Sequence, residues 1–263
     1  MTSWADKIVT AADGTSTEVP GFPPPGVQER FVGRSGAAAL EEVRPFVDLI
    51  DRYVDVNEGT VAIDFGAGWG RIARFFQDRI GDGNNFHLMD VDPEALEWCR
   101  TCRVVGNRQQ IDPNGKLPLE SGSVSLVYAY SVFSHLSERS AIHWLEEFKR
   151  AIKPDGILVF TTQSLRFLDL VRACSEVEAP NPIEERIGKY MNNPQEAVNQ
   201  FREGNFVYSD TGGGGVLSGE FYGWAALPLD WMRAQFAGSF EIVEYIDDPA
   251  YFEQAVVVAK KIS

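Results

Sequence analysis

The sequence has no long apolar run, few cysteines and few histidines. None of its 263 residues fall in a stretch long enough to span a membrane, and the chain does not open with a charged-then-apolar secretion signal. Three cysteines suit a reducing compartment. We therefore expect a cytoplasmic protein with no membrane partner.

Basic residues are also scarce, with 24 Lys and Arg against 38 Asp and Glu and a net charge of −14. Phosphate backbones are bound by concentrated Lys and Arg, so this balance argues against a nucleic-acid partner. A hydrophobic content of 44% and a charged content of 24% are those of a soluble globular chain. The length suits one sizeable domain with additions rather than two full domains.

Metal-binding patterns are missing as well. Cys99 and Cys102 have C-x-x-C spacing, but they lie inside a predicted helix, and no second pair completes a zinc site. We interpret them as free thiols and expect no metal.

The most informative stretch is residues 60–76. Residues 60–65 are β-branched and apolar, which is typical of a buried strand. Gly66, Gly68 and Gly70 follow, and then apolar residues at helical spacing. A strand, a glycine turn and a helix start place backbone N–H groups around one point, where an anion or a polar ligand tail can bind. A tight turn without a ligand is the alternative, since such turns are common in α/β folds.

A second short strand, residues 86–90, ends in Asp90, about 20 residues after the last glycine. In nucleotide-binding βαβ units an acid at this place accepts hydrogen bonds from ribose hydroxyls. Asp92 precedes Pro93 and is the better cap for a helix over residues 94–103. Asp90 is therefore expected to be free for a ligand.

The rest of the chain continues the alternation of helices and strands. We expect helices over residues 37–53 and 138–152 and strands over residues 108–111, 123–130 and 157–162. The strand over residues 123–130 is apolar on both faces, as in the centre of a parallel sheet. Strands over residues 240–246 and 254–260 have a short link, which predicts an antiparallel pair.

These elements predict an α/β fold with a doubly wound, mostly parallel seven-stranded sheet and an antiparallel C-terminal strand pair. Residues 1–36 are expected to form an N-terminal arm, which either folds over a ligand or lies on the surface. Residues 37–263 are expected to form the main domain, with an insertion at about 165–226 between strands five and six. Within it, the glycines at 212–215 lack the strand-to-helix context of a P-loop, which favours a mobile loop.

Three segments, taken in order, resemble the motifs of class I S-adenosylmethionine (SAM)-dependent methyltransferases. They are residues 63–71 (IDFGAGWGR), 88–96 (LMDVDPEAL) and 153–160 (KPDGILVF). The resemblance covers residues 59–162 and the C-terminal strand pair. It implies that SAM is the cofactor and that a methyl group passes to an oxygen or nitrogen of a small-molecule acceptor.

The resemblance also implies roles in cofactor binding. Asp64 would hold the methionine amino group, and Asp90 would accept the ribose hydroxyls. The turn beside the methionine moiety and the contacts to adenine would come from Gly66, Ala67, Gly68, Val91 and Asn114.

The loop after the strand over residues 123–130 should face the reactive end of a ligand, because ligands of open α/β sheets bind beyond the carboxyl ends of the strands. His135 is the one histidine of three in that loop. It is the candidate catalytic base, since a pKa near 6.5 suits proton removal at neutral pH. A capping or packing role is the alternative. Tyr222 and Trp224 are candidate substrate residues or members of a small satellite core.

Two other functions stay open. Related proteins carry an acid near the start of the fourth strand, where this chain has Ser125, so a SAM-binding protein without catalysis is an alternative. A nicotinamide-dependent oxidoreductase is another, although the G-x-G-x-G spacing and the terminal strand pair count against it. Methyl transfer can be accelerated by placement alone, so a base is not obligatory. The sequence does not determine the oligomeric state.

Overall fold

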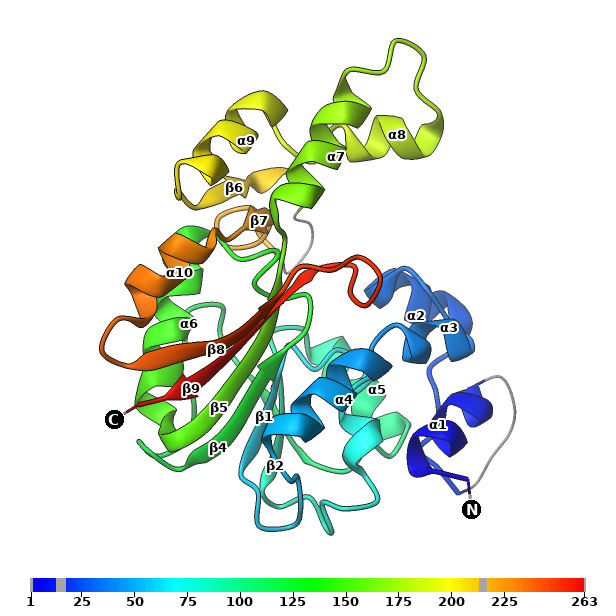
Figure 1. Cartoon of the computed structure of the whole chain (residues 1–263). Helices are drawn as coiled ribbons and strands as arrows, with labels where there is room; N and C mark the ends of the chain where they lie inside the picture. Colours follow the sequence, from blue (N-terminus) through cyan, green and yellow to red (C-terminus); the bar gives the residue numbers. More distant parts are fainter. Residues whose placement is uncertain (1, 13–17, 213–216, 263) are drawn as a thin grey trace.

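The computed structural model describes residues 2–12, 18–212 and 217–262. At its centre is a seven-stranded sheet with the order β3-β2-β1-β4-β5-β9-β8 (Figure 1). The strands cover Ala62–Phe65 (β1), Phe86–Asp90 (β2), Asn107–Gln110 (β3), Val124–Ala129 (β4), Ile152–Thr162 (β5), Phe240–Ile246 (β8) and Ala255–Lys261 (β9). β1 to β5 pair in parallel, whereas β9 lies antiparallel between β5 and β8. The predicted fold class is confirmed.

Helices cover both faces of this sheet (Figure 1). The first layer contains α1 (Trp4–Ala12), α3 (Gly36–Glu41), α4 (Arg44–Tyr53), the 3₁₀-helix η1 (Ala73–Phe76) and α5 (Pro93–Thr101). The second layer contains α6 (Glu138–Ala151) and α10 (Leu229–Phe236). Along β4, Leu126 and Tyr128 face the first layer, while Val127 and Ala129 face the second. All four side chains are buried, as expected for a central parallel strand.

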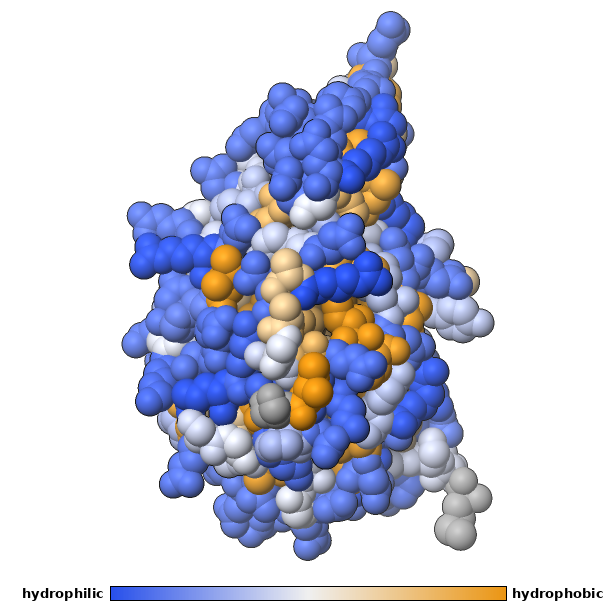
Figure 2. All heavy atoms as spheres, turned by 60° about the vertical axis from the view of Figure 1, so that its left-hand side comes forward, coloured by the Kyte–Doolittle hydropathy of each residue, from blue (hydrophilic) through white to orange (hydrophobic). Residues whose placement is uncertain are grey.

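The segment between β5 and α10 rises beyond the carboxyl edge of the sheet (Figure 1). It contains α7 (Leu165–Ser175), α8 (Pro182–Ile187), α9 (Pro194–Arg202), β6 (Val207–Ser209), the 3₁₀-helix η2 (Asp210–Gly212) and β7 (Trp224–Ala226). β6 and β7 pair antiparallel, and the segment has an apolar cluster of its own, which includes Leu168, Val171 and Val198. On the face shown in Figure 2 its surface is mostly hydrophilic, as expected where the apolar side chains are turned inward.

Several local predictions need correction. The helix expected over residues 37–53 is two helices, α3 and α4, because Pro45 in the first turn of α4 has no N–H and its ring excludes a continuous helix. The apolar spacing after the glycine turn yields only the short η1. Residues 4–12, which lack a clear periodicity, nevertheless form α1, and Trp4 donates to the carbonyl of Arg74 at 2.9 Å. Residues 213–215 of the expected glycine loop lie outside the described residues.

Arg74 joins the N-terminal segment to the glycine turn. Its side chain is fully buried, and the guanidinium lies over the rings of Phe22 and Trp69, 4.4 and 4.8 Å from their centroids. It donates to four backbone carbonyls, those of Pro20, Gly21, Trp69 and Gly70. Burial lowers the pKa of Arg74 to about 10, so the group is still charged at neutral pH. The cation is thus stabilised by carbonyl dipoles and aromatic faces.

We expect Arg74→Met to lower the free energy of unfolding by about 3 kcal/mol, because buried carbonyls lose their donor and no water replaces it. Arg79→Met is the matched control. Arg79 is about 31% exposed and pairs with Asp51 at the surface, so its loss should cost less than about 1 kcal/mol. Urea denaturation of both variants measures the difference, and equal losses would contradict the role given to Arg74.

Candidate functional site

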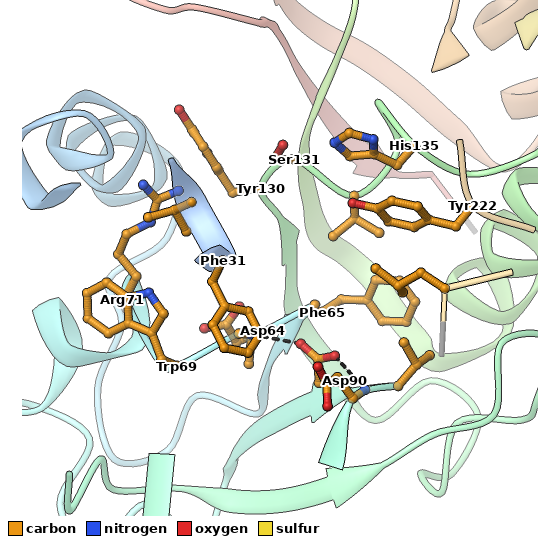
Figure 3. A pocket seen from close by; sticks show the side chains of 18 of the residues that line it. Phe31, Asp64, Phe65, Trp69, Arg71, Asp90, Tyr130, Ser131, His135 and Tyr222 are labelled. Atoms are coloured by element: carbon orange, nitrogen blue, oxygen red, sulfur yellow. Dashed lines mark hydrogen bonds between the residues drawn. The ribbon is translucent and has the colours of Figure 1, made fainter. Parts of the chain in front are cut away.

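A cavity of about 620 Å³ lies at the carboxyl ends of β1, β2 and β4 (Figure 3). The strand order reverses between β1 and β4, which is where open α/β sheets bind their ligands. Its walls come from these strand ends, from α2 (Pro25–Val32) and from the insertion. Its volume is in the range of pockets that hold small molecules.

The glycine turn forms one side of the cavity. Gly66, Gly68 and Gly70 have φ angles of 76°, 53° and 75°, which favour glycine. A Cβ on Gly66 would lie 2.4 Å from Val132, and one on Gly70 would lie 2.9 Å from Val104, so packing requires both glycines. A Cβ on Gly68 would meet nothing within 4 Å. Gly68 therefore leaves room for a ligand to approach the backbone.

The turn does not offer the ring of free N–H groups that the sequence predicts. The N–H groups of Gly66 and Ala67 donate to the carbonyl of Met89, and that of Gly68 donates to Asp90. No α-helix begins after the turn, since η1 is a single 3₁₀ turn. These three N–H groups are therefore not free as expected, although all three residues line the cavity.

Asp90 joins the ends of β1 and β2. Its Oδ2 accepts the N–H of Gly68 at 2.8 Å, and its Oδ1 accepts the N–H of Asp92 at 2.9 Å, as the dashed lines of Figure 3 show. Asp92 caps α5 as predicted. The sequence predicts that Asp90 is free for a ligand, but it is hydrogen-bonded to two backbone N–H groups of the protein. Each carboxylate oxygen keeps a second lone pair for a ligand hydroxyl. Burial raises the pKa of Asp90 to about 6.

Asp64 also lines the cavity, with only 2% of its surface exposed. Among the described residues its Oδ2 has no partner in hydrogen-bond geometry, although the buried hydroxyl of Tyr128 is a neighbouring donor; burial raises the pKa of this carboxyl to about 7. A buried acceptor without a donor is costly unless a ligand supplies one. The amino group of a bound cofactor fits this need.

The side of the cavity next to β3 is apolar. Val91 lines it as expected, together with Ile111 and Pro113. Asn114 is not among the lining residues, and its neighbour Pro113 takes that place. A flat apolar ring such as adenine fits between such side chains.

His135 lies at the opposite wall, with its ring stacked on Tyr222 at 4.7 Å between centroids (Figure 3). Its Nδ1 lies 2.7 Å from the carbonyl oxygen of Gly223. A carbonyl only accepts, so Nδ1 carries the hydrogen and Nε2 keeps its lone pair. Burial lowers the pKa of His135 to about 4, so the expectation of a pKa near 6.5 is wrong. At neutral pH the imidazole is an uncharged hydrogen-bond acceptor.

The two aromatic candidates of the insertion, Tyr222 and Trp224, have different positions. Tyr222 lines the cavity, and burial raises the pKa of its hydroxyl to about 12. Trp224, on β7, stacks against Tyr190 at 4.0 Å and Phe167 at 5.5 Å in the apolar cluster of the insertion. The ring of Trp224 also packs against that of His135, with 4.8 Å between the centroids, but Trp224 does not line the cavity.

The structure adds residues that sequence reasoning missed. Arg71 pairs with Glu42 at 3.3 Å, and its guanidinium lies 5.2 Å from the ring centroid of Tyr130. The Tyr130 hydroxyl donates to Glu42 at 3.1 Å. Arg71 could have been suspected because it directly follows the glycine turn. Phe31 of α2 lines the same side but had no sequence signal.

The order of the sheet, the glycine turn with its neighbouring acid, and the antiparallel C-terminal pair define the class I methyltransferase fold. Residues 63–160 match the family model described as a methyltransferase domain. This match bears out the resemblance of the sequence motifs to methyltransferases over that part of the chain.

Solved structures share this fold at low identity. A SAM-dependent methyltransferase from Aquifex aeolicus is 18% identical, covers 92% of this chain and 100% of its own, and has a TM-score of 0.51. One from Mesorhizobium loti is 13% identical, with coverages of 83% and 97% and a TM-score of 0.53. A Pyrococcus horikoshii protein is 13% identical, with coverages of 86% and 90% and a TM-score of 0.57. At these identities the similarity shows the fold alone.

Within the described ranges, no cluster of three or more His, Cys, Asp or Glu could hold a metal ion. No helix in the same ranges is both long and apolar enough to cross a membrane. Cys99, Cys102 and Cys174 are buried free thiols.

Asp90→Ala should destabilise the ligand-free protein by about 2 kcal/mol, because two backbone N–H groups lose their acceptor. Asp90→Asn keeps one carbonyl oxygen and should lose about half as much. Thermal denaturation without ligand measures both variants. An unchanged melting temperature in Asp90→Ala would show that the carboxylate does not hold the turn.

Proposed function

We propose that this protein transfers the methyl group of SAM to an oxygen or nitrogen of a small-molecule acceptor. The observation that carries the proposal is that one cavity has a wall with two acidic side chains and, opposite it, an aromatic wall. Asp64, Asp90 and the glycine turn form the first, and the His135–Tyr222 pair forms the second. Phe31 from α2 and Tyr222 from the insertion line it from two sides, and such a walled cavity favours a small acceptor over a long polymer. The net charge of −14 also disfavours nucleic acid.

Each cofactor group finds a partner of suitable chemistry in this assignment. Asp90 accepts the ribose hydroxyls with its remaining lone pairs, and Asp64 accepts from the methionine amino group. Val91 and Ile111 pack on the adenine, and Gly68 leaves space for the backbone approach of the ligand. Asn114 has no role in this assignment.

SAM supplies an electrophilic methyl group when it is bound. The chain contributes placement, because holding a nucleophile in line with that methyl group can provide most of the acceleration. His135 accepts a hydrogen bond through Nε2 from the acceptor O–H or N–H and orients a lone pair of the attacking atom. Since its pKa is about 4, it suits a neutral amine or an acidic hydroxyl rather than an ammonium or an aliphatic alcohol.

A SAM-binding protein without catalysis is the second candidate. It is favoured by one observation, the weak basicity of His135, which leaves no strong base at that wall of the cavity among the described residues. Turnover with an acceptor separates the two candidates.

The protein should bind S-adenosylhomocysteine and not NAD in titration calorimetry. Ionised Asp90 is the form that accepts both ribose hydroxyls, and its pKa of about 6 lies above the unfolded value. Proton uptake by Asp90 alone should therefore lower the affinity for S-adenosylhomocysteine about tenfold from pH 7 to pH 5, and proton uptake by Asp64 should lower it further.

Asp90→Asn is the control for this pH dependence. It should bind weakly at both pH values and lose the step near pH 6, while a step from Asp64 near pH 7 is retained. Binding of NAD without S-adenosylhomocysteine would refute the proposed function.

His135→Asn should lower turnover about tenfold once an acceptor is in hand, the loss expected for one orienting hydrogen bond. Asn can keep the donor to the Gly223 carbonyl but has no atom in place of Nε2, so S-adenosylhomocysteine affinity should change little. Steady-state kinetics and calorimetry of the same variant give both values. Full turnover with a lowered melting temperature would assign His135 to packing alone.

A further inference from the structure

Ser131 lies two residues after the end of β4 and lines the cavity. Its φ is 58°, a left-handed conformation that few residues other than glycine adopt. Such strained residues persist where the surrounding structure holds them, and they gather at functional sites. Figure 3 places the Ser131 side chain between Tyr130 and His135, on the side away from Asp90.

A closed ring of hydrogen bonds holds this residue. The N–H of Ser131 donates to Thr161 Oγ1 at 2.7 Å, Thr161 Oγ1 donates to Gln254 Oε1 at 2.6 Å, and Gln254 Nε2 donates to Ser131 Oγ at 2.9 Å. Thr161 is 1% exposed, so the ring is shielded from water on that side. The buried Thr161 hydroxyl needs an acceptor, and Gln254 Oε1 supplies it, so the amide of Gln254 is oriented with Nε2 toward Ser131 Oγ.

The direction of these bonds leaves the hydroxyl hydrogen of Ser131 outside the ring. Its Oγ already accepts from Gln254, and Ser134 Oγ is 3.5 Å away, at the limit of a hydrogen bond. Ser131 can therefore donate to a molecule in the cavity. An anionic oxygen is the acceptor that gains most from such a donor.

The two ends of the cavity differ in polarity. Val91, Ile111 and Pro113 make an apolar patch on the β3 side, next to the charged Arg30, Asp92 and Glu94, whereas the β4 side carries the largely buried ion pair of Arg71 and Glu42. β2 and β4 flank β1 on opposite sides, so a ligand with its ribose on Asp90 extends toward Ser131 in one direction and toward the apolar wall in the other. Adenine suits the apolar wall, and a zwitterionic amino acid suits the charged side.

We propose that Ser131 binds the carboxylate at the amino-acid end of the cofactor through its hydroxyl hydrogen, and that Thr161 and Gln254 are the residues that position it. The assignment rests on the proposed function, because it takes the bound molecule to be SAM or S-adenosylhomocysteine. It adds a specific donor at the end of β4.

The test compares S-adenosylhomocysteine with 5′-methylthioadenosine, which keeps adenine, ribose and sulfur but has no amino-acid group. Ser131→Gly removes the hydroxyl and also relieves the backbone strain. Its affinity for S-adenosylhomocysteine should fall about tenfold, while its affinity for 5′-methylthioadenosine stays the same. Its melting temperature without ligand should not fall.

Ser134→Ala is the matched control, since it removes a neighbouring buried hydroxyl that does not line the cavity. It should bind both ligands as the wild type does. Gln254→Leu should lower S-adenosylhomocysteine affinity alone, and it should add nothing in the Ser131→Gly background, because it acts through Ser131.

Two results would overturn the assignment while leaving the proposed function intact. One is wild-type affinity of Ser131→Gly for S-adenosylhomocysteine. The other is an equal loss for both ligands, which would mean a general change of cavity shape. Failure of the wild-type protein to bind S-adenosylhomocysteine would instead refute the proposed function, and the assignment of Ser131 with it.

Discussion

The hydrogen bond between the N–H of Gly68 and the carboxylate of Asp90 is the contact on which the site depends. It links the turn after β1 to the end of β2 at 2.8 Å and sets the width of the cavity there. The bond needs Gly68 at a φ of 53°, which glycine adopts without strain. It also needs a short acidic side chain, so that the carboxylate stays at the end of β2. The glycine pattern and the acid are therefore one structural unit.

The opposite wall of the cavity depends on aromatic stacking. Tyr222, His135, Trp224 and Tyr190 are in contact in that order, with centroid distances of 4.7, 4.8 and 4.0 Å. This series connects the wall of the cavity to the apolar cluster of the insertion. The same packing removes water from the imidazole and keeps it neutral. The insertion therefore decides both the shape of the acceptor side and the basicity of His135.

The amino-terminal segment lines another side of the cavity, and Arg74 holds this segment in place away from the cavity. Arg74 binds the carbonyls of Pro20 and Gly21, and α2 follows a few residues later and places Phe31 at the cavity. Glu42, at the end of α3, pairs with Arg71 directly after the glycine turn. Arg71 and Arg74 both lie in the short stretch that follows the glycine turn. This stretch therefore holds the amino-terminal segment that packs against the turn.

The sequence by itself determined the sheet, the glycine turn and the helix cap at Asp92, because strand patterns, positive-φ glycines and capping residues are local properties. Only the tertiary structure decided what lies around them. Burial lowers the pKa of His135, Pro113 replaces Asn114 at the cavity, and Trp224 packs in the insertion. Ser131 became visible only through Thr161 and Gln254, which lie 30 and 123 residues away in the chain. Desolvation and long-range contacts depend on which segments meet, and no local pattern encodes that.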